Sequence, residues 1–182
     1  RGPRCRAGRA PVTPPVMKAP DRTSPVHLPE PKEVRDLLGD LLDRDVTLKP
    51  GPPFAVNGHY PASVAQFVDD SLVVRAVVAF DLPLSAHAGA ALALVPASGS
   101  EQAIEDGALP DTLGEGLQEV FNVFSSVFNV GEAAHLKLYS AHTSGQDVPA
   151  DARIRTQVLG RRADFHVDVA GYGSGRVAVV LT

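Results

Sequence analysis

The order of hydrophobic patterns along this 182-residue chain is the feature that most constrains its fold. Apolar residues at helical spacing mark residues 31–42, and β-branched residues then dominate residues 62–80. A short apolar helix at 86–94 and a longer amphipathic helix at 111–129 follow. Because the strands come in runs with helices between them, the sequence predicts an α+β fold with a mainly antiparallel sheet packed against helices.

The C-terminal part of the chain is predicted to return to strands. We expect strands at 135–141, 154–159, 163–170 and 176–181. The stretch from Gly171 to Gly175 superficially resembles a phosphate-binding glycine loop, but that mechanism needs a helix N-terminus directly after the glycines. A strand follows here, so we interpret the stretch as a hairpin turn. Shorter features are a strand opening at Val46, a hairpin turn at Asp69–Asp70 and at most one or two helical turns at 101–106.

The N-terminal segment differs from the rest of the chain in charge and composition. Residues 1–26 hold six basic side chains against Asp21, a local charge of +5, which leaves −9 for the remainder at a total of −4. The segment is rich in proline and nearly lacks large apolar residues, so it cannot bury enough surface to offset its chain entropy. We expect a disordered basic tail at 1–27 and one folded domain at 28–182. The segment is short and lacks interleaved aromatics for a nucleic-acid-binding arm, and its prolines prevent the amphipathic helix of a transit peptide, so a solvated tail is favoured.

Composition excludes several classes of function. Cys5 is the sole cysteine, which rules out an internal disulfide framework and a cysteine-ligated zinc site. The six histidines are scattered without a metal-ligand spacing, so no metal site is predicted. The longest apolar stretch, 88–95, is too short to span a bilayer, and the acidic balance with 5% aromatics does not favour nucleic-acid binding. We expect a cytoplasmic protein that binds neither membrane nor nucleic acid.

The predicted helix at 111–129 carries an unusual polar stripe. Opposite its apolar face lie Glu115, Glu119, Asn122 and Ser126, at positions i, i+4, i+7 and i+11. Asparagine is a poor residue for a helix interior, and two glutamates four residues apart repel each other slightly. Glutamates are common on the solvated face of a helix, but neither the asparagine nor the pair of glutamates stabilises this helix. Two locally unfavourable choices on one exposed stripe therefore indicate a function.

The stripe resembles the motif of the CheC/CheX-type chemotaxis phosphatases. That motif places an acidic or serine residue, then a glutamate four positions on, then an asparagine three further, on an exposed helix face. Glu119 and Asn122 match the defining pair, and Glu115 stands where the family usually has Asp or Ser. The order of elements from about Pro31 to Leu181 is also similar. Pro149 is the candidate for the downstream proline of the family, although it lies several residues later than the pattern has it.

The resemblance implies a function and a partner. The substrate would be the aspartyl phosphate of a response-regulator receiver domain, hydrolysed by a water that Asn122 positions. Glu119 would pair with the lysine of the receiver's phosphorylation site, and Glu115 and Ser126 would extend the docking edge. No cofactor of its own is implied, since the receiver would supply Mg²⁺. One copy of the motif is visible, as in CheX-like members of the family.

A second function is compatible with the same fold. The chain would then be a non-catalytic receiver-binding or motor-switch-like adaptor, with the stripe serving as an interface. In either case the exposed edges of the predicted sheet would permit a homodimer.

Overall fold

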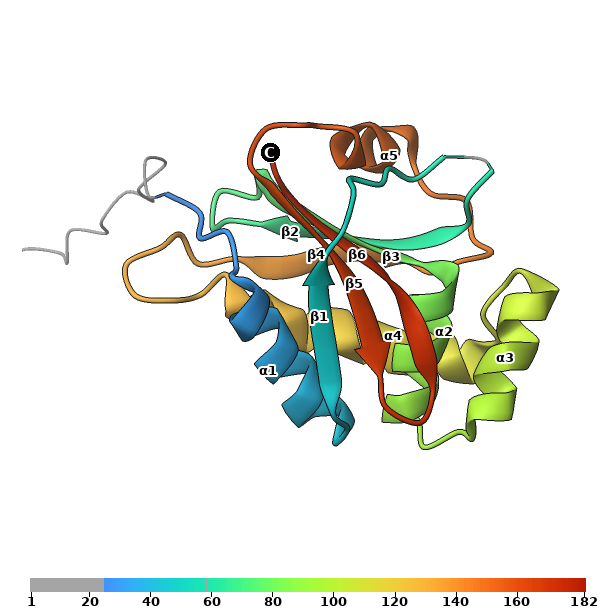
Figure 1. The fold of residues 1–182 in the computed structure, drawn as a ribbon. Coiled ribbons are helices and arrows are strands. Elements are labelled where there is room, and N and C mark those ends of the chain that lie inside the picture. Colours follow the sequence, from blue (N-terminus) through green and yellow to red (C-terminus); the bar gives the residue numbers. More distant parts are fainter. Residues whose placement is uncertain (1–24, 58) are drawn as a thin grey trace, which may run out of the picture.

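The chain folds around one six-stranded sheet whose strands are all antiparallel to their neighbours (Figure 1). The computed structural model describes residues 25–57 and 59–182. Its elements are α1 (Pro31–Leu42), β1 (Val46–Pro50), β2 (Ala62–Val68), β3 (Val74–Asp81), α2 (Leu82–Leu92), α3 (Ala97–Asp106), α4 (Asp111–Phe124), the 3₁₀ turn η1 (Ser125–Val127), β4 (Lys137–His142), α5 (Ala150–Thr156), β5 (Arg162–Val169) and β6 (Gly173–Leu181). The strand order is β1-β5-β6-β3-β2-β4. The α+β class predicted from the sequence is confirmed.

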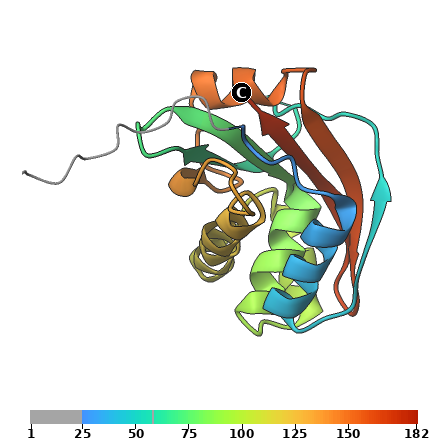
Figure 2. The same cartoon turned by 90° about the vertical axis from the view of Figure 1, so that its left-hand side faces the viewer.

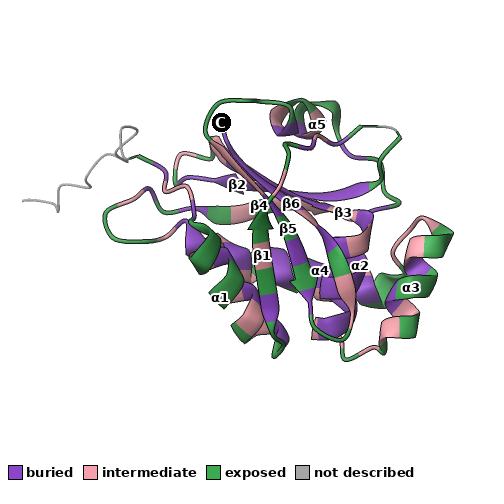
Figure 3. Cartoon of the chain, in the orientation of Figure 1, coloured by how far each residue is buried: buried purple, intermediate pink, exposed green. Residues whose placement is uncertain are grey.

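Helices cover both faces of this sheet. On one face lie α1, α2 and α4, and on the other α5 lies with the segment that follows β1 (Figures 1 and 2). Alternate residues of β3 point to the two layers, Val78 and Phe80 to the larger core and Val77 and Ala79 to the smaller one. The central strands are therefore mostly apolar on both faces, and they are buried along most of their length (Figure 3).

The sheet has an internal two-fold pattern. The first half runs α1-β1-β2-β3 and the second runs α4-β4-β5-β6, with α5 inserted between β4 and β5. In each half the last two strands form a hairpin, and the edge strand pairs with the hairpin of the other half: β1 with β5, and β4 with β2. The two halves meet at the central pair β3–β6. In this pattern α1 is the counterpart of α4, and α1 contains no asparagine, so the motif stands in one half alone.

The predicted strand at 154–159 is wrong, because this stretch contributes to α5 and the loop after it. Pro149 is the N-cap of α5, and the buried residues Ala152 and Thr156 are four apart, which is helical spacing. Ile154 is 62% exposed, so its β-branched side chain is not part of the core. The alternation of apolar and polar residues that favoured a strand is here a property of an exposed helix end.

Other boundaries shift by a few residues. The helix predicted at 86–94 begins at Leu82, because Asp81 accepts a hydrogen bond from the backbone N–H of Leu84 and caps it. α3 is a ten-residue helix and not one or two turns. β4 begins at Lys137. The hairpin turn at Asp69–Asp70 lies where the sequence predicts it. The turn predicted at Gly171–Gly175 is shorter, because Gly173–Gly175 already pair with β5 as the start of β6.

The predicted tail lies outside the described residues except for Pro25–His27. These three residues pack onto the domain, and Val26 is buried in the main core. The carbonyl of Pro25 accepts from the N–H of Ala134, and that of Val26 accepts from the guanidinium of Arg161. The packed part of the chain therefore includes residues just before the predicted boundary at 28. Among the described residues no helix is long and apolar enough to cross a membrane.

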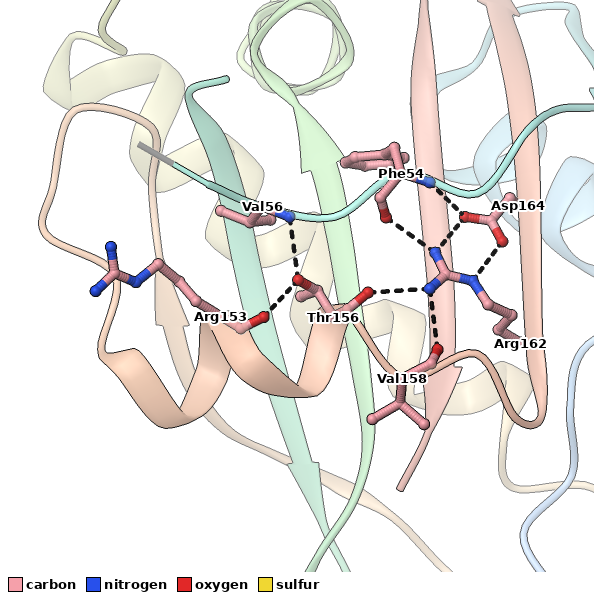
Figure 4. A network of polar contacts seen from close by, with 7 residues as sticks. All are labelled: Phe54, Val56, Arg153, Thr156, Val158, Arg162 and Asp164. Atoms are coloured by element: carbon pink, nitrogen blue, oxygen red, sulfur yellow. Dashed lines mark hydrogen bonds and ion pairs between the residues drawn. The ribbon is translucent and has the colours of Figure 1, made fainter. Parts of the chain in front are cut away.

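A buried arginine fastens the α5 layer to the sheet (Figure 4). Arg162 on β5 pairs with Asp164, with N–O distances of 2.6 and 2.7 Å, and both side chains are less than a tenth exposed. The same guanidinium donates to the carbonyls of Phe54, Thr156 and Val158 at 2.9 to 3.0 Å. All five N–H donors of the arginine are thereby used. This network ties the end of α5 and the segment after β1 to one strand.

Candidate functional site

The candidate site is the solvent face of α4. The helix buries Leu113, Leu117, Val120, Phe121 and Phe124 against the sheet and α2. Phe121 and Phe124 meet Phe80 of β3 edge to face, with ring centroids 5.0 and 6.1 Å apart. Burial of one face at helical spacing leaves the opposite face to solvent.

A close crossing with α2 fixes how α4 is rotated. A Cβ built on Gly116 would lie 2.6 Å from the carbonyl oxygen of Gly89, and one built on Gly89 would run into the carbonyl of Leu113. Glycine at both positions lets the two helix backbones touch. The rotation of α4, and with it the direction of its polar stripe, is therefore set by packing on the buried side.

The structure brings the predicted site residues together on one surface. Glu115, Glu119 and Asn122 are exposed along α4, and Ser126 is exposed in η1, where the helix tightens. The predicted helix of 111–129 is therefore an α-helix to Phe124 followed by one 3₁₀ turn. The stripe runs without interruption from the second turn of α4 into η1.

Glu119 and Asn122 lie next to each other across one helical turn. The Nδ2 of Asn122 donates to Oε2 of Glu119 at 3.5 Å, a long contact that gives little energy. The hydroxyl of Ser125 donates to the backbone carbonyl of Asn122 at 2.8 Å, so it leaves the amide side chain unoccupied. The Oδ1 and the second N–H of Asn122 remain available to solvent, one as acceptor and one as donor.

The two glutamates of the stripe are free to meet a cation. Within residues 25–57 and 59–182, neither Glu115 nor Glu119 forms an ion pair. An exposed carboxylate beside an exposed amide can pair with a lysine while the amide holds a water molecule. These side chains can therefore pair with a lysine and hold a water molecule without a bound cofactor.

Other candidates from the sequence fall outside the stripe. Pro149 is the N-cap of α5, in the layer on the far side of the sheet from α4, so it does not adjoin the motif helix (Figure 2). No group of three or more His, Cys, Asp or Glu that could hold a metal ion occurs in the described part of the chain. His87 is buried and its Nδ1 lies 3.0 Å from the hydroxyl of Ser100. Burial lowers the pKa of His87, and the nearby carboxylates of Asp81, Glu101 and Asp168 offset part of that effect.

Comparison with known proteins identifies the fold. Searches by sequence find no matching family model and no matching curated protein. The FliM middle domain from Vibrio alginolyticus superposes with a TM-score of 0.50 at 11% identity, over 82% of this chain and 86% of that one. A chain of the FliM–SpeE complex from H. pylori gives 0.51 at 8% identity, over 83% and 80%. A chain of the CheX–CheY–BeF₃–Mg²⁺ complex from Borrelia burgdorferi gives 0.48 at 12% identity, over 82% and 93%.

The fold is CheC-like. It is the fold that the resemblance predicts for residues from about Pro31 to Leu181, and that prediction is confirmed. At identities this low the likeness concerns the fold, and function rests on the residues of the site.

Sequence reasoning missed a cavity that adjoins the stripe of this CheC-like domain. Beside Glu115 lies a cavity of about 300 Å³ between the first turns of α4 and the turn at 143–146. Asp111 and Gln118 share the face of Glu115, at helical spacing that the sequence does show. The turn is brought there by the pairing of β4 with β2, which no local pattern reveals.

Proposed function

We propose that this chain is a CheX-like phosphatase that removes the phosphoryl group from the aspartate of a response-regulator receiver domain. One observation carries the proposal: Glu119 and Asn122, the pair that matches the motif, lie side by side and exposed on a helix whose rotation is fixed from behind. A pair used for helix stability alone would not need this combination of residues.

The chemistry asked of the chain is modest. An acyl phosphate is already activated, and the Mg²⁺ that neutralises its charge belongs to the receiver. What the catalyst adds is a water held in line with phosphorus. The side chain of Asn122 can accept one hydrogen from that water through Oδ1 and donate to its oxygen through Nδ2. No covalent intermediate on this chain is required.

Glu119 has the complementary role of docking. Its carboxylate would pair with the lysine of the receiver's phosphorylation site, and among the described residues it has no ion-pair partner to give up. The 3.5 Å contact between Asn122 and Glu119 is long enough to break at little cost as the two side chains turn to the water and the lysine. Glu115 and Ser126 would extend the contact at the two ends of the stripe.

The second candidate is a non-catalytic adaptor that uses the same stripe as an interface. It is favoured by the likeness to FliM middle domains, one of the structures being a FliM–SpeE complex. Under this function the stripe binds a receiver or another partner, and no phosphoryl group is lost.

The two functions are separated by turnover and binding measured on the same variants. Asn122→Ala should reduce the accelerated loss of the phosphoryl group by about 100-fold, because the water is no longer held in line, while receiver binding stays unchanged. Gln102→Ala is the matched control, since it removes an exposed amide from α3. Binding of a receiver by the unaltered chain without accelerated loss of its phosphoryl group, with that binding weakened in Asn122→Ala, would favour the adaptor.

A further inference from the structure

The cavity beside Glu115 has a polar and acidic lining. Three side chains of α4, Asp111, Glu115 and Gln118, form one wall, and Thr143, Ser144 and Gln146 form the other. No lysine, arginine or histidine of residues 25–57 and 59–182 lines it. Within the part of the chain that the structure describes, neither of its two carboxylates is in an ion pair. Asp111 lies in the first turn of α4, at the end of the cavity nearest the helix N-terminus.

A buried hydroxyl without a partner points to a ligand in the same cavity. Ser144 is 2% exposed, and its Oγ has no hydrogen bond. Its backbone is fully engaged, because its N–H donates to the hydroxyl of Ser63 at 2.9 Å and its carbonyl accepts from the N–H of Leu109 at 3.1 Å. The backbone of Ser144 is thus held in place while its hydroxyl is unsatisfied, which costs about 1–3 kcal/mol in a folded protein. A donor entering the cavity would remove that cost.

We propose that the cavity receives a lysine or arginine side chain of the protein that docks on α4. A cationic side chain supplies what the lining lacks: positive charge for Asp111 and Glu115, and N–H donors for the hydroxyl of Ser144 and the side-chain oxygen of Gln118. The aliphatic stem of such a residue can lie against the helix and the turn while its charged end reaches the carboxylates.

The position of the cavity makes it a second anchor for the same partner. Glu115 belongs to both the cavity and the stripe, and it lies seven residues before Asn122, about 10 Å along the helix. This inference rests on the proposed function for the identity of the partner. It requires a receiver surface with two cations, one meeting Glu119 and one meeting Glu115 and Asp111, which lie about one and two helical turns before Glu119.

The cavity can be probed without any partner. We would titrate the ¹⁵N-labelled chain with n-butylammonium, a model of the lysine side chain, and with n-butyrate, an anion of the same shape. We expect saturable shifts of the backbone amides of Gly114, Ser144 and Gln146 with the cation alone, lost in Asp111→Asn/Glu115→Gln. The absence of saturable shifts, or equal shifts with butyrate, would overturn the cavity whatever the phosphatase assay shows. Saturable shifts in a chain that dephosphorylates no receiver would leave the cavity standing and count against the proposed function.

Kinetics with a responsive receiver test the anchor itself. Glu115→Gln should raise KM by about tenfold and leave kcat unchanged, because it removes a contact made equally before and during reaction. Asp40→Asn on α1 removes the same charge from an exposed site on another helix and should leave KM unchanged. Gly114→Leu fills the cavity without changing charge and should raise KM like Glu115→Gln. An unchanged KM in both cavity variants, or an equal rise in Asp40→Asn, would contradict the anchor.

Discussion

The crossing of α2 and α4 predicts opposite effects for two glycines that stand two residues apart. A Cβ on Gly116 would lie 2.6 Å from the backbone oxygen of Gly89, so the helices must separate by about 0.8 Å to reach an ordinary contact of 3.4 Å. A Cβ on Gly114 would meet Thr143 at 3.7 Å, which is already an ordinary contact. The chemical change is the same at both positions, and the surroundings differ.

The magnitudes follow from two opposing contributions. Alanine in place of glycine stabilises a helix interior by about 0.5–1 kcal/mol, and this applies to both positions. Overpacking against a backbone atom that cannot rotate away costs about 1–3 kcal/mol, and this applies to Gly116 alone. We expect Gly114→Ala to raise the free energy of unfolding by about 0.5–1 kcal/mol. Gly116→Ala should lower it by about 1–2 kcal/mol.

Thermal unfolding followed by circular dichroism measures the contrast. A difference of about 2 kcal/mol between the variants corresponds to Tm values about 4–8 °C apart in a domain of this size. Urea titration with an unchanged slope would show that both variants keep the compactness of the parent. Equal stabilisation by both substitutions would refute the close crossing, and with it the argument that packing fixes the direction of the stripe.

Further predictions concern the buried polar groups. Arg162→Met should lower the free energy of unfolding by about 3–5 kcal/mol, because it leaves the carboxylate of Asp164 buried without its partner. The urea midpoint measures this, and restoration of part of the loss in Arg162→Met/Asp164→Leu is expected. Stability should fall as the pH drops below about 6.5, since the unfolded chain then protonates His87 while burial holds the pKa of the folded residue below 6.5. His87→Gln should make the free energy of unfolding depend less steeply on pH in this range. An unchanged dependence on pH would contradict the role assigned to His87.

Asp69 also makes the protein less stable as the pH falls, as His87 does, but for a different reason. Burial raises its pKa, but hydrogen bonds from the N–H groups of Val73 and Ser71 and the guanidinium of Arg75 lower it more, so the net pKa lies below 3.8. The ionised carboxylate of Asp69 therefore stabilises the folded state. This contribution to the free energy of unfolding is lost as the pH falls below 3.8 and through the lower pKa of the folded state. Asp69→Asn should make acid unfolding between pH 2 and about 4 less steep.

Periodicity along the chain predicted the parts of the structure that local physics determines. The amphipathic pattern of residues 111–129 set both the buried and the exposed face of α4, because helical spacing alone decides which residues share a face. The strand predicted at 154–159 is wrong because Ile154 and Val158 are exposed. The residues that α5 buries are Ala152 and Thr156, at helical spacing. Apolar residues on a short exposed helix carry no signal of the core.

Tertiary pairing explains what the sequence could not show. The internal two-fold pattern consists of the pairing of β1 with β5 and of β4 with β2. This pairing does not require the two halves to have similar sequences. The cavity beside Glu115 depends on the same pairing, since β4 carries the turn with Ser144 up to α4. A serine in a polar turn has no local feature that marks it as buried.

Catalysis of phosphoryl-group loss by this chain is tested most directly by a turnover experiment. Receiver domains from the source organism would be phosphorylated, and the decay of the label followed with the chain present in substoichiometric amounts. We predict that one receiver loses all its label at a rate proportional to the amount of chain, and that Asn122→Ala slows this decay to the receiver's own rate. An unchanged half-life on every receiver, with a folded chain even in excess, would contradict the claim.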